Sequence, residues 1–290
     1  MRPFTTFNLK QAVVFFLILA FRIANAQTGS YSWKPDADLS RAICSRIAVP
    51  SGFARVPADS DSFADWLRHL PLKDDRPPVM LYDGEQKVNQ GAHFAVLDID
   101  VGRENLQQCA DAVIRLRAEY FYSKHHFDLI SFNFTNGDSA SFSNWLLGYR
   151  PVIDGNKSKW IRSESVDSSY ANFRRYLDCV FTYAGTLSLS RELEKVDNAA
   201  DISISDVFIR GGKPGTSNPG HAVIVTDLAR DTITGQAIFI LAQSYMPAQD
   251  IHILKNPNDS AISPWYRLPH TKFLHTPEWD FKIDELKRFK

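Results

Sequence analysis

The order of the hydrophobic patterns along the chain constrains its fold more than any other feature of the sequence. Before residue 200, apolar residues recur every three or four positions in several segments. The clearest of these covers residues 104–122, which contain no Gly or Pro. After residue 200, the apolar residues form short β-rich runs that turn formers separate. Helices followed by a meander of strands predict one α+β domain, in which helices pack on an antiparallel sheet.

The same patterns predict the remaining elements. We expect helices at 62–70, 141–147, 169–183, 188–194 and, in the charged amphipathic tail, 282–290. We expect strands at 79–82, 94–99, 130–135, 202–209, 222–227, 237–242 and 251–254, after an extended lead-in at 27–41. Thr234-Gly235 marks a hairpin turn between two of these strands.

The first 26 residues are typical of a secretory signal peptide. Arg2 and Lys10 supply the positive start, residues 12–21 are an unbroken apolar run, and Ala24-Asn25-Ala26 is a small-x-small cleavage site. An uncleaved anchor is the alternative, although the run is about half of what a membrane-spanning helix needs. We therefore expect a secreted or periplasmic protein with a single domain over 27–290 and no membrane span after cleavage.

The composition argues against several partner classes. Lys plus Arg and Asp plus Glu number 33 each, so no positive excess indicates a nucleic-acid partner. His125-His126 and the pair Asp98 and Asp100 do not have the spacing of a known metal signature, so we expect no metal and no cofactor. Cys44, Cys109 and Cys179 permit one disulfide in an oxidising compartment, but the sequence does not choose the pairing.

Cys109 is the first candidate for chemistry. Asn105, followed three residues later by Gln108, resembles a capping box and would place Cys109 in the first turn of a helix. There the helix dipole and nearby backbone N–H groups lower the pKa of a thiol and favour the nucleophilic thiolate. If the helix begins earlier, after Asp100, that advantage weakens. The alternative interpretation is a buried structural cysteine.

His221 and Gln243 are the second and third candidates. His221 begins a predicted strand just after a loop rich in Gly and Pro, where a histidine can face a cleft and act as a general base. A hairpin centred near residue 232 places Gln243 opposite His221, and its amide would orient the imidazole. A slip of one residue would put Ser244 or Ala242 there instead. The alternative for His221 is a histidine bonded to a backbone carbonyl at a sheet edge.

Further residues would complete such a site. Backbone N–H groups at the start of the Cys109 helix, with Gln107 or Gln108, would stabilise an oxyanion, and Ser244 would contribute to substrate binding. A metal-dependent hydrolase built on His221, His252 and nearby acids is a separate interpretation, and it predicts metal in the purified protein.

Two resemblances to known families follow from longer strings. The strings LYDGEQKVNQGAHFAVLDIDVG, LQQCADAVIRLRAEY, FTYAGTLSLSREL, AQSYMPAQDIHILKNP and TPEWDF resemble family 4846 of the domains of unknown function, a group of secreted or envelope-associated bacterial proteins. This resemblance implies no established activity. Residues 205–209 and 220–225 are similar to the two strands of NlpC-type peptidases, which are papain-like cysteine enzymes that cut peptide links in cell-wall peptidoglycan.

The NlpC resemblance implies a fold and a set of roles. In that family the cysteine opens a helix before the sheet, the histidine follows on a strand, and a third polar residue orients it. Cys109, His221 and Gln243 have the same order here. Ser205 replaces the usual Gly, and extra helices must be inserted between Cys109 and Asp206. The sequence therefore predicts a papain-like thiol hydrolase, an amidase or peptidase for wall peptides. The alternative is a non-catalytic envelope binding or structural protein.

Overall fold

The computed structural model describes residues 28–213, 215–216 and 219–290. The expected signal peptide at 1–26 lies outside the described residues. The helices are α2 (Ile43–Arg46), α3 (Phe63–Arg68), α4 (Cys109–Ser123), α5 (Phe142–Leu146), α6 (Tyr170–Tyr183) and α7 (Thr186–Glu192). Short 3-10 turns occur at Leu39–Arg41, Gln90–Ala92, Phe127–Leu129, Ala199–Asp201 and Ile283–Glu285.

The strands lie mostly after residue 200. The earlier ones are β1 (Thr28–Tyr31), β2 (Lys34–Asp38), β3 (Phe53–Arg55), β4 (His93–Val96), β5 (Ser131–Asn133), β6 (Ser139–Ser141), β7 (Tyr149–Asp154), β8 (Lys157–Arg162) and β9 (Glu194–Lys195). The later ones are β10 (Val207–Gly211), β11 (Gly220–Asp231), β12 (Ala237–Gln243), β13 (His252–Leu254), β14 (Trp265–Arg267), β15 (Phe273–His275), β16 (Asp280–Lys282) and β17 (Leu286–Arg288).

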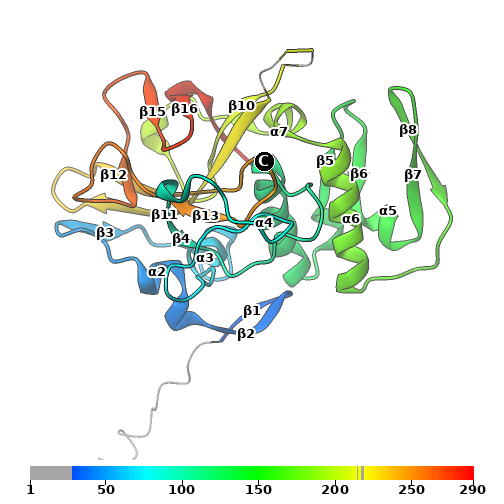
Figure 1. Ribbon diagram of the computed structural model, residues 1–290, viewed down its shortest axis with the longest axis horizontal. Coiled ribbons are helices and arrows are strands. Elements are labelled where there is room, and N and C mark those ends of the chain that lie inside the picture. The colour runs from blue at the N-terminus through cyan, green and yellow to red at the C-terminus, as the bar shows by residue number, and fades with distance from the viewer. Residues whose placement is uncertain (1–27, 214, 217–218) are drawn as a thin grey trace, which may run out of the picture.

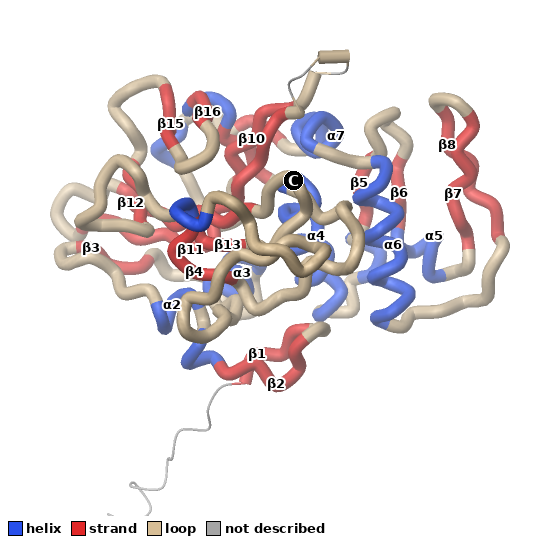
Figure 2. Tube along the Cα trace, in the orientation of Figure 1, coloured by secondary structure: helices blue, strands red, loops and turns tan. Residues whose placement is uncertain are grey.

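One antiparallel sheet organises the molecule. Its strand order is β4-β13-β12-β11-β10-β17-β9, with β14 added on β12 and β3 added on β11. Every residue of β12 and the first ten of β11 are buried, so other elements cover both faces of the sheet at its centre. Figure 2 shows these strands in red beside the helices. The predicted α+β class, with helices packed on an antiparallel sheet, is confirmed.

The helix α4 occupies the centre of the fold. It packs on β11 and β12 of the sheet and also contacts α3 and α7, so little of its surface reaches solvent. Two charged residues on it, Arg115 and Glu119, are fully buried and pair with each other. Their pairing satisfies charges that burial would otherwise penalise. A helix enclosed in this way holds its first residues in a fixed position against the sheet.

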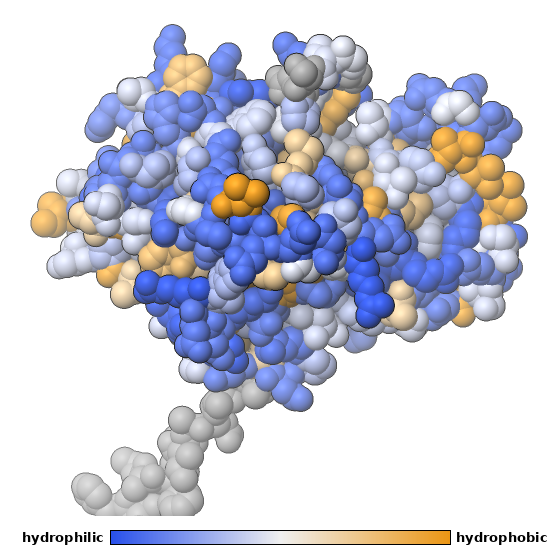
Figure 3. Space-filling view, in the orientation of Figure 1, coloured by the Kyte–Doolittle hydropathy of each residue, from blue (hydrophilic) through white to orange (hydrophobic). Residues whose placement is uncertain are grey.

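The segment between α4 and α7 forms a separate flank of the molecule. It contains β5, β6, α5, the β7–β8 hairpin and α6, which lie together on the right of Figure 1. Apolar side chains gather at the outer edge of this flank in Figure 3. In the β7–β8 hairpin, the side chains of Val152 and Ile161 are about half exposed. This segment contains strand hairpins as well as the helices expected there.

A buried carboxylate ties β11 to the elements beneath it. Asp227 is fully buried, and its Oδ2 accepts a hydrogen bond from Arg55 Nε at 2.7 Å. Its Oδ1 accepts from Arg68 Nη2 at 2.8 Å and from the backbone N–H of Leu228 at 2.9 Å. This cluster joins β3, α3 and β11.

Some predicted elements were wrong. The tail at 282–290 is not a helix, because β17 pairs with β10 and β9 and completes the edge of the sheet. Residues 79–82 form only isolated bridges instead of a strand. The helix predicted at 104–122 begins at Cys109. Among the described residues, every helix is too short or too polar to cross a bilayer.

Candidate active site

Cys109 is the first residue of α4. The residue before it, Gln108, is the N-cap: its backbone N–H donates to Asp111 Oδ2 at 3.0 Å, and its side-chain Nε2 donates to Asn105 Oδ1 at 3.3 Å. The helix is therefore capped at Gln108, through the Asp111 carboxylate, and not at Asn105 as the sequence suggested. The later start places Cys109 in the first turn, where the backbone N–H groups have no partner within the helix.

The thiol of Cys109 is buried against the central sheet. Only 6 % of the surface of Cys109 is exposed to solvent. Burial, reinforced by the charge of Asp111, raises the pKa of the thiol to about 12. Three backbone N–H groups near the sulfur lower this pKa, but by less than burial raises it; they belong to Ala222, Ala110 and Cys109 itself. The predicted lowering of this pKa was therefore wrong, because the effect of burial exceeds that of the helix start.

His221 lies on β11, one residue before the Ala222 amide that contacts the Cys109 sulfur. It pairs with Arg210 of β10, and its ring is enclosed by the rings of Tyr245, Trp279 and Phe281 at centroid distances of 4.9, 5.3 and 5.7 Å. Burial is the main reason that the pKa of His221 is lowered to about 4. The imidazole is therefore neutral at physiological pH.

The side chain of Gln243 forms a hydrogen bond with the His221 ring. The distance between His221 Nε2 and Gln243 Oε1 is 2.8 Å. The predicted register was two residues off, since Ile224 pairs with Ala242 and a bulge lies between Val225 and Asp227. A shift of two residues keeps a side chain on the same face of a strand, so the two side chains still meet, on a diagonal.

A buried carboxylate fixes which way the Gln243 amide points. Gln243 Nε2 donates to Glu278 Oε2 at 2.8 Å, and a carboxylate can only accept hydrogen bonds. The amide oxygen must then face His221, and His221 Nε2 must carry the proton that it donates. The other ring nitrogen, Nδ1, is left with its lone pair and makes no hydrogen bond within the described part of the chain.

Two more residues complete this buried network. Lys87 Nζ donates to Glu278 Oε2 at 2.5 Å and balances its charge. His252 Nε2 lies 3.3 Å from Gln243 Nε2, while its Nδ1 lies 2.9 Å from the Asp250 carbonyl. His252 therefore accepts at Nε2 and donates at Nδ1, which is the neutral form. Burial, with the charge of Lys87, lowers the pKa of His252 to about 3.

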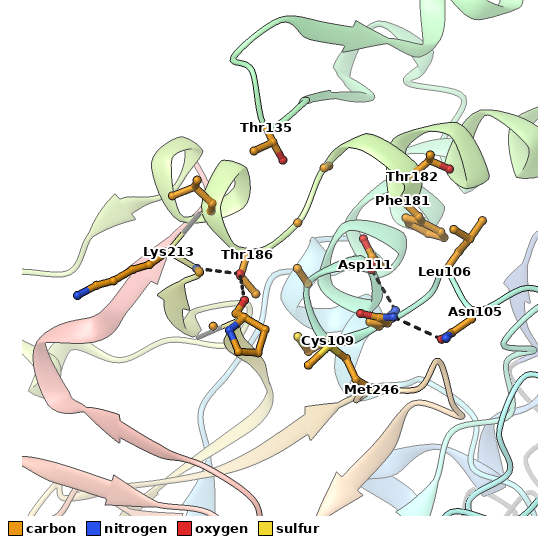
Figure 4. A pocket seen from close by; sticks show the side chains of 18 of the residues that line it. Asn105, Leu106, Cys109, Asp111, Thr135, Phe181, Thr182, Thr186, Lys213 and Met246 are labelled. Carbon is orange, nitrogen blue, oxygen red and sulfur yellow. Dashed lines mark hydrogen bonds between the residues drawn. The ribbon is translucent and has the colours of Figure 1, made fainter. Parts of the chain in front are cut away.

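A surface pocket of about 550 Å³ opens in front of Cys109. One wall consists of the start of α4, including Gln108, and another consists of the α6–α7 junction with Thr186. Figure 4 shows the Thr186 hydroxyl donating to the Pro219 carbonyl at 2.7 Å and accepting from the Gly212 N–H at 3.0 Å. These bonds hold Gly212 and Pro219 beside the pocket.

The three candidates for oxyanion or substrate contact lie in different places. Gln108 lines the pocket. Gln107 is buried and accepts a hydrogen bond from Arg115 through its side-chain oxygen, while its Nε2 has no partner among the described residues. Ser244 is also buried, and its hydroxyl lies 3.0 Å from the Gln107 carbonyl and 2.8 Å from the Gln249 carbonyl. Gln107 and Ser244 are not among the residues that line the pocket.

Among the described residues, the site contains neither a disulfide nor a group of side chains that could hold a metal ion. Cys44, Cys109 and Cys179 are all free thiols. In the part of the chain that the structure describes, no three His, Cys, Asp or Glu side chains come together as a metal ion would require. His221 and His252 instead share the hydrogen-bonded network around Gln243.

Sequence reasoning missed Glu278, Lys87 and Tyr245. Glu278 and Gln243 are 35 positions apart in the chain, and Lys87 lies far upstream in a polar loop. The only available signal is that Glu278 falls within the string TPEWDF, whose Trp279 and Phe281 enclose His221. A string of this kind indicates importance without stating a role.

The fold and this cluster together define a class of protein. It is an α+β protein in which the cysteine at the start of α4 contacts the backbone of β11 at Ala222, one residue after a histidine that an amide holds. Among the described residues, no hydrogen bond joins Cys109 to His221, and His221 is not one of the residues that line the pocket. The chain belongs to the family described as domain of unknown function (4846), which matches residues 43–288. No curated protein and no solved structure matches the chain.

The two buried histidines predict a loss of stability in acid. Their folded pKa values, about 4 and about 3, lie below the value of about 6.5 in the unfolded chain. Their contribution is therefore complete above pH 6.5 and is lost progressively as the pH falls from 6.5 toward the folded values, because only the unfolded chain binds protons in that range. Between pH 7 and 4.5, the wild type should lose roughly 2–3 kcal/mol more unfolding free energy than His252→Asn, as measured by urea denaturation. Parallel pH curves for the two proteins would contradict the assignment.

Proposed function

We propose that the protein is a secreted or periplasmic papain-like thiol hydrolase, an amidase or peptidase that acts on cell-wall peptides. Cys109 is the nucleophile, His221 the general base, and Gln243 the residue that orients His221. The observation that carries the proposal is the 2.8 Å contact between His221 Nε2 and Gln243 Oε1. This contact supports His221 as a base, because it leaves the ring nitrogen Nδ1 unprotonated. His221 also lies on β11, the strand whose Ala222 N–H contacts the Cys109 sulfur.

The proposed reaction starts from a neutral thiol and a neutral imidazole. As the Cys109 sulfur attacks an amide carbonyl, its proton passes to His221 Nδ1. Backbone N–H of Cys109, at the start of α4, donates to the oxyanion, with the Gln108 side chain beside it in the pocket. The imidazolium then protonates the leaving amine as the C–N bond breaks. Water releases the acyl group from the thioester.

Glu278 supports this reaction as a positioning residue. It accepts from Gln243 Nε2 and so keeps the amide oxygen turned toward His221. When the imidazole takes a proton, it becomes a cation that Gln243 continues to hold through the Nε2–H bond. The positive charge of Lys87 balances the negative charge of Glu278, so the hydrogen-bonded network around Gln243 is neutral before the reaction.

The pocket supports a peptide as substrate. Its lining carries short polar side chains, including Thr135, Thr182 and Gln108, which can hydrogen-bond to peptide groups. The signal-like sequence at 1–26 would carry the protein to the compartment that holds the cell wall.

The test supplies amide substrates of two kinds. Purified peptidoglycan fragments and a mixed peptide library are incubated with the wild type and with Cys109→Ser, and new primary amines are quantified and identified by mass spectrometry. We expect amines from the peptidoglycan fragments with the wild type only. Cleavage of the library alone would show the cell-wall assignment to be wrong, and equal amine release by both proteins would refute the hydrolase.

A non-catalytic envelope binding protein is the second candidate. The burial of Cys109, which raises its pKa to about 12, favours this function because a core thiol of this kind is inert. In that case both proteins should bind the same peptidoglycan fragments with equal affinity and release no amine.

A further inference from the structure

A second cysteine and histidine lie on two neighbouring segments, and neither residue lines the pocket. Cys44 is in α2, and His69 is the residue that ends α3. Backbone contacts fix the two segments side by side: the Ile43 N–H donates to the Leu70 carbonyl at 3.0 Å, and Ala42 pairs with Pro71. The closeness of Cys44 and His69 therefore follows from the main chain.

The contacts of the His69 ring resemble those of an activated thiol pair. Its Nδ1 lies 2.8 Å from the Asp65 carbonyl and 3.3 Å from Asp65 Oδ1. The neighbouring Cys44 side chain is the largest influence that raises the pKa of His69 to about 9, and the carbonyl and charge of Asp65 add to it. His69 is thus oriented by Asp65 and lies next to Cys44.

This cluster is open to solvent, unlike Cys109. Cys44 is partly exposed, and the side chains of His69 and Asp65 are each about one third exposed. Burial raises the pKa of Cys109 to about 12 and that of Cys179 to about 11, which keeps both thiols protonated. Beside the partly exposed Cys44, an imidazolium can instead stabilise the charge of an attacking sulfur.

We propose that Cys44 is the thiol of this protein that exchanges rapidly with disulfides, and so a site of covalent modification distinct from Cys109, activated by His69, which Asp65 orients. The Cys44 thiolate attacks one sulfur of a disulfide, so that a new S–S bond forms as the old one breaks. The His69 imidazolium gives its proton to the departing thiolate. The products are a mixed disulfide on Cys44, a free thiol and neutral His69.

The other charged groups around the cluster leave His69 as the activating cation. Arg41 and Arg46 lie near α2, but both form ion pairs with Asp74. Tyr31 also faces Cys44 and Asp65, and burial raises its pKa far enough that it stays a neutral phenol.

The aromatic disulfide DTNB tests the proposal, because each exchange releases a coloured thiol. We expect one rapid equivalent from native protein at pH 7, lost in Cys44→Ser and retained in Cys109→Ser. His69→Gln should slow this equivalent about tenfold at pH 7, since the thiolate loses its cation. Mass spectrometry of the peptides identifies the modified residue.

Two outcomes would overturn the proposal. A rapid equivalent that persists in Cys44→Ser would assign the reactivity to another thiol. An unchanged rate in His69→Gln, in a protein whose thermal melt matches the wild type, would remove His69 as the activator. Asp65→Asn tests the residue that orients His69, and it should slow the exchange less than His69→Gln does. Neither result depends on hydrolase activity, so this proposal and the proposed function can fail separately.

Discussion

His221→Gln is expected to lower kcat/KM for amide cleavage by about a thousandfold or more. Glutamine is close in volume to histidine and can keep a hydrogen bond with Gln243, but it has no basic nitrogen to accept the Cys109 proton. The Cys109 thiol depends on that acceptor, because burial holds its pKa near 12 and little thiolate exists without a base. The loss should therefore appear mainly in kcat.

A matched substitution controls for this result. His126→Gln makes the same chemical change at an exposed histidine in the turn after α4, and it should leave kcat/KM within about twofold of the wild type. Thermal melts of both variants show whether the fold is intact. Activity of folded His221→Gln equal to that of His126→Gln would contradict the role of His221 as the base.

Asp227→Ala is expected to lower the free energy of unfolding by about 3–5 kcal/mol. The substitution leaves the guanidinium groups of Arg55 and Arg68 without the carboxylate that they share. Arg68 is itself buried, so water cannot fully replace the lost contacts. Urea denaturation measures the change as a lower midpoint.

An exposed ion pair provides the comparison for Asp227. Glu194 lies 3.6 Å from Lys290, and both side chains are largely exposed. Glu194→Gln should change the unfolding free energy by less than about 1 kcal/mol, because solvent screens such pairs. Equal effects of Glu194→Gln and Asp227→Ala would show that the Asp227 cluster does not stabilise the fold.

The sequence predicted the fold class and most of the elements, because helical and strand periodicities are local signals. It failed where distant segments decide the conformation. The tail at 282–290 carries a helical charge pattern, yet Leu286–Arg288 becomes a strand because the edge of β10 offers it unpaired hydrogen-bonding groups. The hairpin register failed because the turn is centred between Ile233 and Thr234 instead of near residue 232, and the bulge between Val225 and Asp227 removes only one residue of that difference.

The candidate site was partly predictable for a related reason. Cys109, His221 and Gln243 could be proposed from their positions at a helix start and at strand ends. The pKa of Cys109 could not, because its value depends on how deeply α4 is buried, and no sequence pattern gives that depth. Glu278 could not be predicted either, since its contact with Gln243 depends on the path of the loops.

The division of the pocket walls between two parts of the chain has a consequence for how such a protein can diversify. The residues proposed to break the bond lie on α4 and the central sheet. Thr135, Phe181 and Thr182 of the opposite wall belong to the flank between α4 and α7. Substitutions in that flank would change the shape of the pocket while the residues proposed to break the bond stay in place. Under the proposed function, selectivity and chemistry could therefore change independently of each other.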